Sequence, residues 1–267
     1  MFDIREHGGV FAGNTLRENN EIFIPRLKKT TPIITKSEYS YGMRQVMTLD
    51  DVSGNLLVAV SPLNGSNGTI DRYNAMTLTK IESKGVYSHV SGYLGEYSIK
   101  QIFGYNAAKS TYYVSGYVYQ GSTSMQYIKA NGPSDSYGKE LFKIVSNYEF
   151  VLSGSDKSYI YFYHCDLGTK IMGFYKLDLS NELVSQIWSI NSVLSIVKLG
   201  NGYFMVNTAS GNTIYNKYGE IVLRPTGALN PFKTSAVYVS KYNKIYHIEF
   251  SSYSSTVFGH DFYVRDA

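Results

Sequence analysis

The feature that most constrains the fold is a local pattern that recurs five times along the chain. In each copy a hydrophobic and aromatic strand stands between two polar turns, with a further strand on either side. These central strands begin at Asn55, Thr111, Ser158, Gly202 and Asn243, so that consecutive copies start between 41 and 56 residues apart. Units of about 40 to 50 residues that hold several strands are typical of propeller blades. The sequence therefore predicts an all-β fold, a β-propeller with five blades.

The composition agrees with strands rather than helices. The 267 residues include 26 Tyr and 13 Phe, and aromatic residues are favoured in strands. One alternative stays open for the segment DLSNELVSQIWSI, where Leu183, Ile187 and Ile190 are at helical spacing. No segment carries the apolar stripe that a helix of three turns needs, so we expect little helix.

Two parts of the chain differ in character. Residues 1–38 hold Gly-rich spots and an extended stretch whose Pro25 and Pro32 exclude a regular helix and fit an edge strand. This part is predicted to be an N-terminal attachment arm, and residues 39–267 are predicted to form the propeller.

The arm also predicts how the ring closes. The last copy of the pattern supplies three strands, one fewer than a four-stranded blade. The segment Glu21 to Thr35 is extended, so we expect part of it to pair with the last copy as its outer strand. Either Ile22 and Ile24 or Ile33 and Thr35 would then face the blade. Such pairing would remove an open sheet edge.

Candidate catalytic residues do not form a recurring set. The aspartates at Asp50, Asp51, Asp71, Asp156, Asp166 and Asp178 occupy different offsets in each copy and are interpreted as residues of turns or strand ends. A catalytic pair of acids would need to lie about 5 to 10 Å apart, which the sequence does not indicate.

Nucleophile motifs are also missing from the sequence. His7-Gly8-Gly9 is similar to an esterase oxyanion loop, but the chain has no Gly-x-Ser-x-Gly elbow. In His164-Cys165-Asp166, neighbouring side chains alternate between opposite faces of one strand, which disfavours a metal site or a Cys-His pair. We therefore expect no enzyme activity, no catalytic, cofactor-binding or metal site, and no cofactor.

The charge and hydropathy exclude two classes of partner. The net charge of +4 is spread along the chain, and the one basic cluster, at Arg26, Lys28 and Lys29, is typical of a solvated edge, so no nucleic acid is expected. No stretch approaches the roughly 18 apolar residues of a membrane span, and membrane insertion is not expected either. Cys165 has no partner for a disulfide within the chain and is interpreted as a small buried residue.

Tyrosines are concentrated in two strands, and these rings are the candidates for surface contact: Tyr113, Tyr117, Tyr119, Tyr159, Tyr161 and Tyr163. Because strand neighbours alternate in direction, each set of three shares a face. Two interpretations stay open. The rings pack between adjacent blades, or some of them are presented to a protein or glycan, since tyrosine offers a wide amphipathic surface.

The opening MFDIREHGGVFAGN and the five copies between Asn55 and Ser251 together resemble tailed-phage virion proteins, namely receptor-binding and baseplate components with a five-bladed propeller. The resemblance covers essentially the whole chain. It rests on layout, because the long coiled-coil stem and additional domains of that family are missing.

The resemblance implies a non-enzymatic structural protein of the phage particle, displayed on the tail or capsid for host attachment. It would be held to other virion proteins by Phe2, Ile4, Arg5, Val10 and Phe11, with a host cell-surface glycan as a further partner and several copies in a symmetric assembly. The alternatives are a glycan-binding module that recognises a receptor and a polysaccharide-degrading enzyme.

Overall fold

The computed structural model describes residues 17–18, 21–22, 43–50, 52–62, 68–86, 98–120, 123–134, 138–200, 202–225, 234–252 and 258–266. The chain divides into two compact units, Met1–Glu38 and Tyr39–Ala267. In the first unit, β1 (Arg17–Glu18) pairs with β2 (Glu21–Ile22) in an antiparallel ladder.

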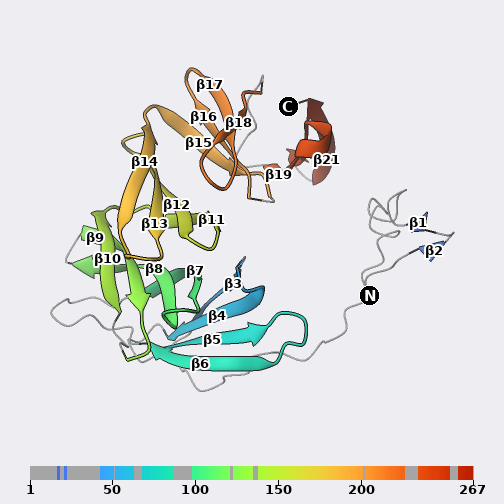
Figure 1. Ribbon diagram of the computed structural model, residues 1–267. Coiled ribbons are helices and arrows are strands. Elements are labelled where there is room, and N and C mark those ends of the chain that lie inside the picture. The colour runs from blue at the N-terminus through green and yellow to red at the C-terminus, as the bar shows by residue number, and fades with distance from the viewer. Residues whose placement is uncertain are drawn as a thin grey trace. The chain divides into compact units, whose positions relative to one another are not determined.

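The second unit is a β-propeller whose antiparallel sheets follow one another in chain order (Figure 1). Blade 1 contains β3 (Met43–Leu49), β4 (Asn55–Pro62), β5 (Gly68–Asn74) and β6 (Lys80–Val86). Blade 2 contains β7 (Ser98–Asn106), β8 (Thr111–Gln120), β9 (Thr123–Asn131) and β10 (Lys139–Val145). Blade 3 contains β11 (Phe150–Ser155), β12 (Tyr159–Asp166), β13 (Ile171–Asp178) and β14 (Val184–Ile190).

Blade 4 contains β15 (Val193–Lys198), β16 (Phe204–Thr208), β17 (Gly211–Tyr215) and β18 (Ile221–Leu223). Blade 5 contains β19 (Thr234–Val239), β20 (Lys244–Ser252) and β21 (Phe258–Asp266). Within each sheet, strands adjacent in the chain are adjacent in space. The predicted all-β propeller and its five-fold repeat are therefore confirmed.

The apolar core lies between the blades. Four buried clusters each join consecutive sheets: Leu57 and Tyr112 meet between blades 1 and 2, Phe103 and Phe162 between 2 and 3, Phe174 and Phe204 between 3 and 4, and Met205 and Tyr238 between 4 and 5. Large rings fill the space between sheets because each sheet buries side chains on both of its faces.

The helical alternative that stayed open for Leu183 to Ile190 is excluded, because the segment is a strand. Val184–Ile190 forms β14, where Trp188 lies opposite Phe174 and Ile190 lies opposite Met172. A 3-10 turn at Ser240–Tyr242 is present in the described part of the chain. None of the described helical segments has the length and apolar character needed to cross a lipid bilayer.

The predicted closing strand is only partly within the described residues. Blade 5 has three described strands, as the sequence predicts, and the described neighbours of β20 are β19 and β21. Ile22 lies opposite Arg17 in the β1–β2 pair of the first unit, and its pairing with the last blade stays a prediction. Ile24, Ile33 and Thr35 lie outside the described residues.

The aspartates stabilise turns, with one exception. Asp156 Oδ1 accepts hydrogen bonds from the backbone N–H groups of Ser158 and Tyr159 at 2.8 Å, and Asp178 accepts one from Ser180 at 2.8 Å. Asp71 instead lies within β5 and is 3% exposed. Lys80 Nζ donates to it at 2.7 Å, so the interpretation of Asp71 as a turn or strand-end residue was wrong.

Candidate functional site

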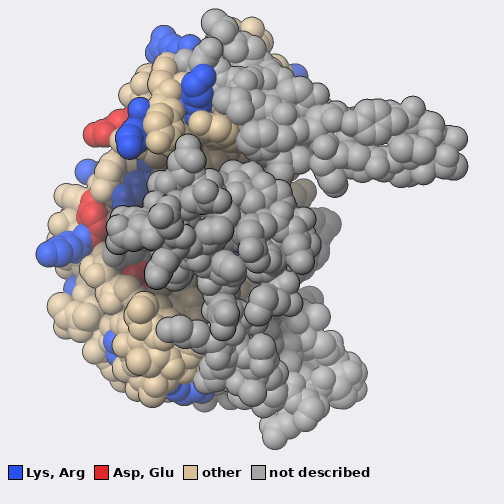
Figure 2. All heavy atoms as spheres, turned by 90° about the vertical axis from the view of Figure 1, so that its right-hand side faces the viewer, with Lys and Arg blue, Asp and Glu red and all other residues tan. Residues whose placement is uncertain are grey.

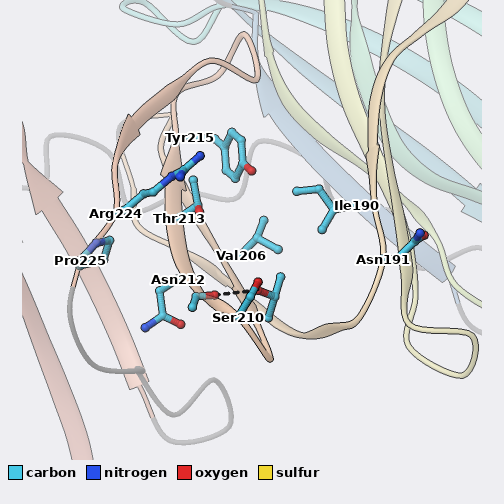
Figure 3. Close-up of a pocket in the computed structure, with 11 residues that line it drawn as sticks. Ile190, Asn191, Val206, Ser210, Asn212, Thr213, Tyr215, Arg224 and Pro225 are labelled. Atoms are coloured by element: carbon cyan, nitrogen blue, oxygen red, sulfur yellow. Dashed lines mark hydrogen bonds between the residues drawn. The ribbon is translucent and has the colours of Figure 1, made fainter.

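A pocket with a largely polar lining lies between blades 3 and 4 (Figure 3), and we name it pocket A. Its volume is about 460 Å³, within the range of small-molecule sites. The lining combines hydroxyl, amide, aromatic, aliphatic and guanidinium groups, contributed by Ile190, Asn191, Val206, Thr208, Ser210, Gly211, Asn212, Thr213, Tyr215, Arg224 and Pro225.

Short connections position these groups. Asn191 lies in the two-residue link between β14 and β15, and Ser210 lies in the tight hairpin between β16 and β17. Thr208 fixes this hairpin, because its Oγ1 donates to the carbonyl of Gly211 at 2.9 Å and lies 3.0 Å from Ser210 Oγ. Gly211 has a φ of 137°, which side-chain-bearing residues rarely adopt. The polar rim is therefore held by the turn itself.

An aromatic stack supports one wall of pocket A. Tyr215 lies 5.4 Å from Phe204 and 4.9 Å from Trp188, measured between ring centroids. Trp188 is in turn fixed by a hydrogen bond from Nε1 to the carbonyl of Gly219 at 2.8 Å. Burial raises the pKa of Tyr215, although Thr213 and Arg224 both act to lower it. Tyr215 thus presents a neutral hydroxyl at neutral pH.

Among the described residues that line the pocket, Arg224 is the single cation and none is acidic. Figure 3 shows its guanidinium beside Tyr215 and Thr213, with Ile190 and Val206 across the pocket. Among the described residues, Arg224 makes no ion pair and no hydrogen bond. A guanidinium without a carboxylate partner is suited to receive an anion through paired hydrogen bonds.

A second cavity, pocket B, lies between blades 2 and 3. It also measures about 460 Å³ and is lined by Ser124, Val145, Ser146, Asn147, Tyr148, Asp166, Gly168 and Thr169. His164 lies beneath this lining, with its Nε2 2.8 Å from Ser146 Oγ. Gln126 Nε2 donates to the carbonyl of Ser146 at 2.9 Å. Ser146 Oγ also accepts the N–H of Tyr148 at 3.0 Å, so this network joins the β10–β11 connection to β12.

His164 makes the stability of the protein depend on pH. Burial lowers its pKa, although Asp166 and the backbone of Tyr148 act to raise it. The unfolded state therefore takes up a proton at a higher pH than the folded state does, and stability falls as the pH drops below about 6.5. We expect this group to contribute a loss of stability of at most about 1.4 kcal/mol per pH unit, measured by urea unfolding between pH 7.5 and 5.

The matched variant for this prediction is His164→Gln, whose amide can still accept a hydrogen bond from Ser146. The difference between the two pH profiles isolates His164 from the other titrating groups. Profiles that remain parallel would contradict the prediction.

The other residues of the His164-Cys165-Asp166 triplet show structural roles. Burial raises the pKa of Cys165 to about 11, so its thiol is protonated at neutral pH and is a poor nucleophile. Asp166 accepts the backbone N–H groups of Gly168 at 2.8 Å and Thr169 at 3.1 Å, which fixes the β12–β13 turn. Those hydrogen bonds, that of Thr169 first, lower the pKa of Asp166.

The described pockets do not have the carboxylate pair of a glycosidase. The described lining of pocket A has no acid, and that of pocket B has Asp166 alone. Within the described residues, no three His, Cys, Asp or Glu side chains are grouped so that they could hold a metal ion.

The tyrosine candidates for surface contact fall into two sets. Tyr113 is 0% exposed and Tyr163 is 5% exposed, and both lie in clusters between blades, so a role in surface contact is wrong for these two rings. Tyr117, Tyr159 and Tyr161 are half-buried, and the side chain of Tyr119 lies outside the described residues. Lysines lie over two of the half-buried rings, with Lys100 Nζ 4.5 Å from the Tyr117 centroid and Lys176 Nζ 4.7 Å from that of Tyr159.

The proposed anchors of the arm, Phe2, Ile4, Arg5, Val10 and Phe11, all lie outside the described residues. The lining of pocket A was not singled out from the sequence. Its residues come from turns and strands between Ile190 and Pro225, and none belongs to a recognised motif.

The surface charge is dispersed. Figure 2 shows Lys and Arg side chains interspersed with Asp and Glu along the described part of one face.

Comparison with known proteins gives likeness at the level of structure alone. No known family and no curated protein matches the sequence. A prolyl oligopeptidase from Galerina marginata matches 83% of this chain with 12% identity and a TM-score of 0.40, and the chain spans 35% of that enzyme.

Two glycosidases also match. For an exo-β-1,3-galactanase from Phanerochaete chrysosporium, the identity is 11% and the TM-score 0.42, with 77% of this chain and 55% of the enzyme covered. For an α-L-arabinofuranosidase from Fusarium graminearum, the identity is 12% and the TM-score 0.42, with 81% and 79% covered.

These matches overturn the prediction of a non-enzymatic phage structural protein. The three structures are a peptidase and two glycosidases, and no virion protein is among them. At identities of 11 to 12%, the activities of these enzymes do not transfer to this chain.

Proposed function

We propose that this propeller binds a small hydroxylated anion in pocket A, and that the ligand is a sugar acid of the hexuronate type. The observation that carries the proposal is Arg224, whose guanidinium lines the pocket without an acidic partner among the described residues. A carboxylate can accept two parallel hydrogen bonds from such a group.

The rest of the lining supports a sugar rather than an apolar acid. Ser210 and Thr213 offer hydroxyl groups and Asn191 offers an amide, which together can donate to and accept from the hydroxyls of a sugar ring. Tyr215 adds an aromatic side chain held by its stack, and Val206 with Ile190 provide apolar contact. The lack of acid in the lining makes binding, rather than carboxylate-assisted hydrolysis, the chemistry of this pocket.

The test is titration calorimetry of the whole chain with glucuronate and galacturonate, using glucose and galactose as neutral counterparts. We expect saturable binding of a sugar acid and at least about tenfold weaker binding of its neutral counterpart. Arg224→Gln should weaken binding of the acid by about ten- to a hundredfold, because it removes a charge-assisted pair of hydrogen bonds.

Lys157→Gln is the matched control. It removes the same charge from an exposed turn outside pocket A and should leave the affinity unchanged. Equal affinity for acidic and neutral sugars, no binding of either acid, or equal losses in the two variants would overturn the proposal.

A further inference from the structure

A third cavity, pocket C, lies between blades 3 and 4 and shares no residue with pocket A. It measures about 130 Å³ and is lined by Leu152, Ser153, Tyr163, Lys198, Gly200, Gly202, Tyr203 and Phe204. Pocket A lies beside Asn191, just before β15, whereas pocket C lies at Lys198, the last residue of that strand. The two cavities therefore occupy opposite ends of β15.

Three polar groups in this lining lack partners. Ser153 Oγ is buried without a hydrogen bond. Tyr163 is 5% exposed, and among the described residues its hydroxyl has no hydrogen-bond partner. Within the same part of the chain, Lys198 has neither an ion pair nor a hydrogen bond. An unsatisfied buried polar group costs about 1 to 3 kcal/mol, so the buried Ser153 hydroxyl, with an ammonium and a phenol beside it that have no described partner, indicates a site for a ligand.

The chemistry of these groups favours a ligand of negative charge. An ammonium and two hydroxyls can all donate hydrogen bonds, and none of the described residues that line the cavity is a carboxylate. Lys198 as a residue reaches solvent, which leaves a path of entry, while the surrounding protein lowers the pKa of its amine by desolvation. Lys217 is also close to this cavity, because a Cβ added to Gly202 would lie 3.1 Å from the Cβ of Lys217. The Nζ of Lys217 already donates to the carbonyl of Ser155 at 3.1 Å, so we do not count Lys217 among the ligands.

With about 130 Å³ against the 460 Å³ of pocket A, pocket C is too small for a sugar acid. Its described lining has hydrogen-bond donors but none of the side-chain amides that could bind sugar hydroxyls. We propose that pocket C binds a small tetrahedral oxyanion, with Lys198, Tyr163 and Ser153 as its ligands. Free phosphate and the phosphate group of a monoester share this chemistry, and the test separates them.

The experiment is titration of the whole chain with inorganic phosphate at constant ionic strength, followed by calorimetry and by ³¹P NMR. We expect saturable binding at one site. Lys198→Gln should weaken it at least about tenfold, and Ser153→Ala and Tyr163→Phe should each weaken it about three- to tenfold. Methyl phosphate serves as the monoester, and its tighter or weaker binding assigns the source of the oxyanion.

Two controls keep the inference separate from a general effect of charge or folding. Lys157→Gln should bind phosphate as the unmodified chain does, because Lys157 lies outside both pockets. Lys198, Tyr163 and Ser153 lie outside pocket A, so failure of the sugar-acid proposal leaves this one standing. Without phosphate, Ser153→Ala and Tyr163→Phe should melt within about 2 °C of the parent, because neither loses a hydrogen bond. Non-saturable binding, or equal losses in Lys157→Gln and Lys198→Gln, would overturn the assignment.

Discussion

Replacing Phe174 with alanine is expected to lower the free energy of unfolding by about 3 to 5 kcal/mol, the usual cost of removing a fully buried aromatic side chain. Phe174 is 0% exposed and lies between two further rings. Its centroid is 4.9 Å from Trp188 at an interplanar angle of 16°, and 5.7 Å from Phe204 at 11°. Because Phe174 belongs to blade 3 and Phe204 to blade 4, the cavity left by alanine would open the interface between them.

Urea unfolding followed by Trp188 fluorescence measures this effect, since Trp188 is the single tryptophan and contacts the altered position. Tyr242→Ala is the control, because that ring is 57% exposed and its loss should change stability by less than about 1 kcal/mol. A similar small change for Phe174→Ala would show that blades 3 and 4 do not depend on this stack.

Gly219→Ala is expected to cost about 2 to 5 kcal/mol, the sum of a backbone and a packing penalty. Gly219 has a φ of 79°, in the left-handed region that disfavours side chains. A Cβ there would lie 2.5 Å from Phe174 Cε1 and 3.0 Å from Trp188 Nε1. The new methyl group would therefore displace the buried stack and strain the hydrogen bond from Trp188 to the carbonyl of Gly219.

Gly54→Ala separates the two penalties. Gly54 has a φ of 66°, and no atom lies within 4 Å of its added Cβ, so this change carries the backbone cost alone, about 1 to 2 kcal/mol. The packing penalty of Gly219→Ala should also be smaller in the double variant with Phe174→Leu, because the smaller leucine side chain leaves space for the new methyl group. Equal losses for Gly54→Ala and Gly219→Ala, or strict additivity in the double variant, would contradict this account.

The sequence correctly predicts the strands because their signals are local. Alternating apolar and aromatic residues bounded by polar turns placed the central strands at Asn55, Thr111 and Ser158, within one residue of β4, β8 and β12. Aspartates such as Asp156 and Asp178 marked turns because their carboxylates bond backbone N–H groups two or three residues away. The role of Asp71 could not be predicted in this way, because its partner Lys80 lies on the neighbouring strand. The register between the two strands decides that these residues meet.

The exposure of the tyrosines could not be predicted from strand alternation. Alternation gives Tyr113 and Tyr117 the same face, yet Tyr113 is completely buried and Tyr117 is half-buried. The difference depends on where along the strand the next blade covers it, and blade 3 contributes Phe162 to the buried cluster that holds Tyr113. That contact is a property of the packed sheets and not of either strand alone.

The recurrence of strands and turns thus determines the all-β propeller, since it needs only the period of the side chains and the length of each unit. The pockets required the tertiary structure. Ser153, Tyr163 and Lys198 lie on three strands of two blades, and only the packing of blade 3 against blade 4 brings them to one cavity. Arg224 likewise meets Asn191 across a pocket because β14 and the end of β18 belong to adjacent sheets. No local sequence pattern predicts which residues of two sheets line the same pocket, because this depends on the distance and angle at which the sheets pack.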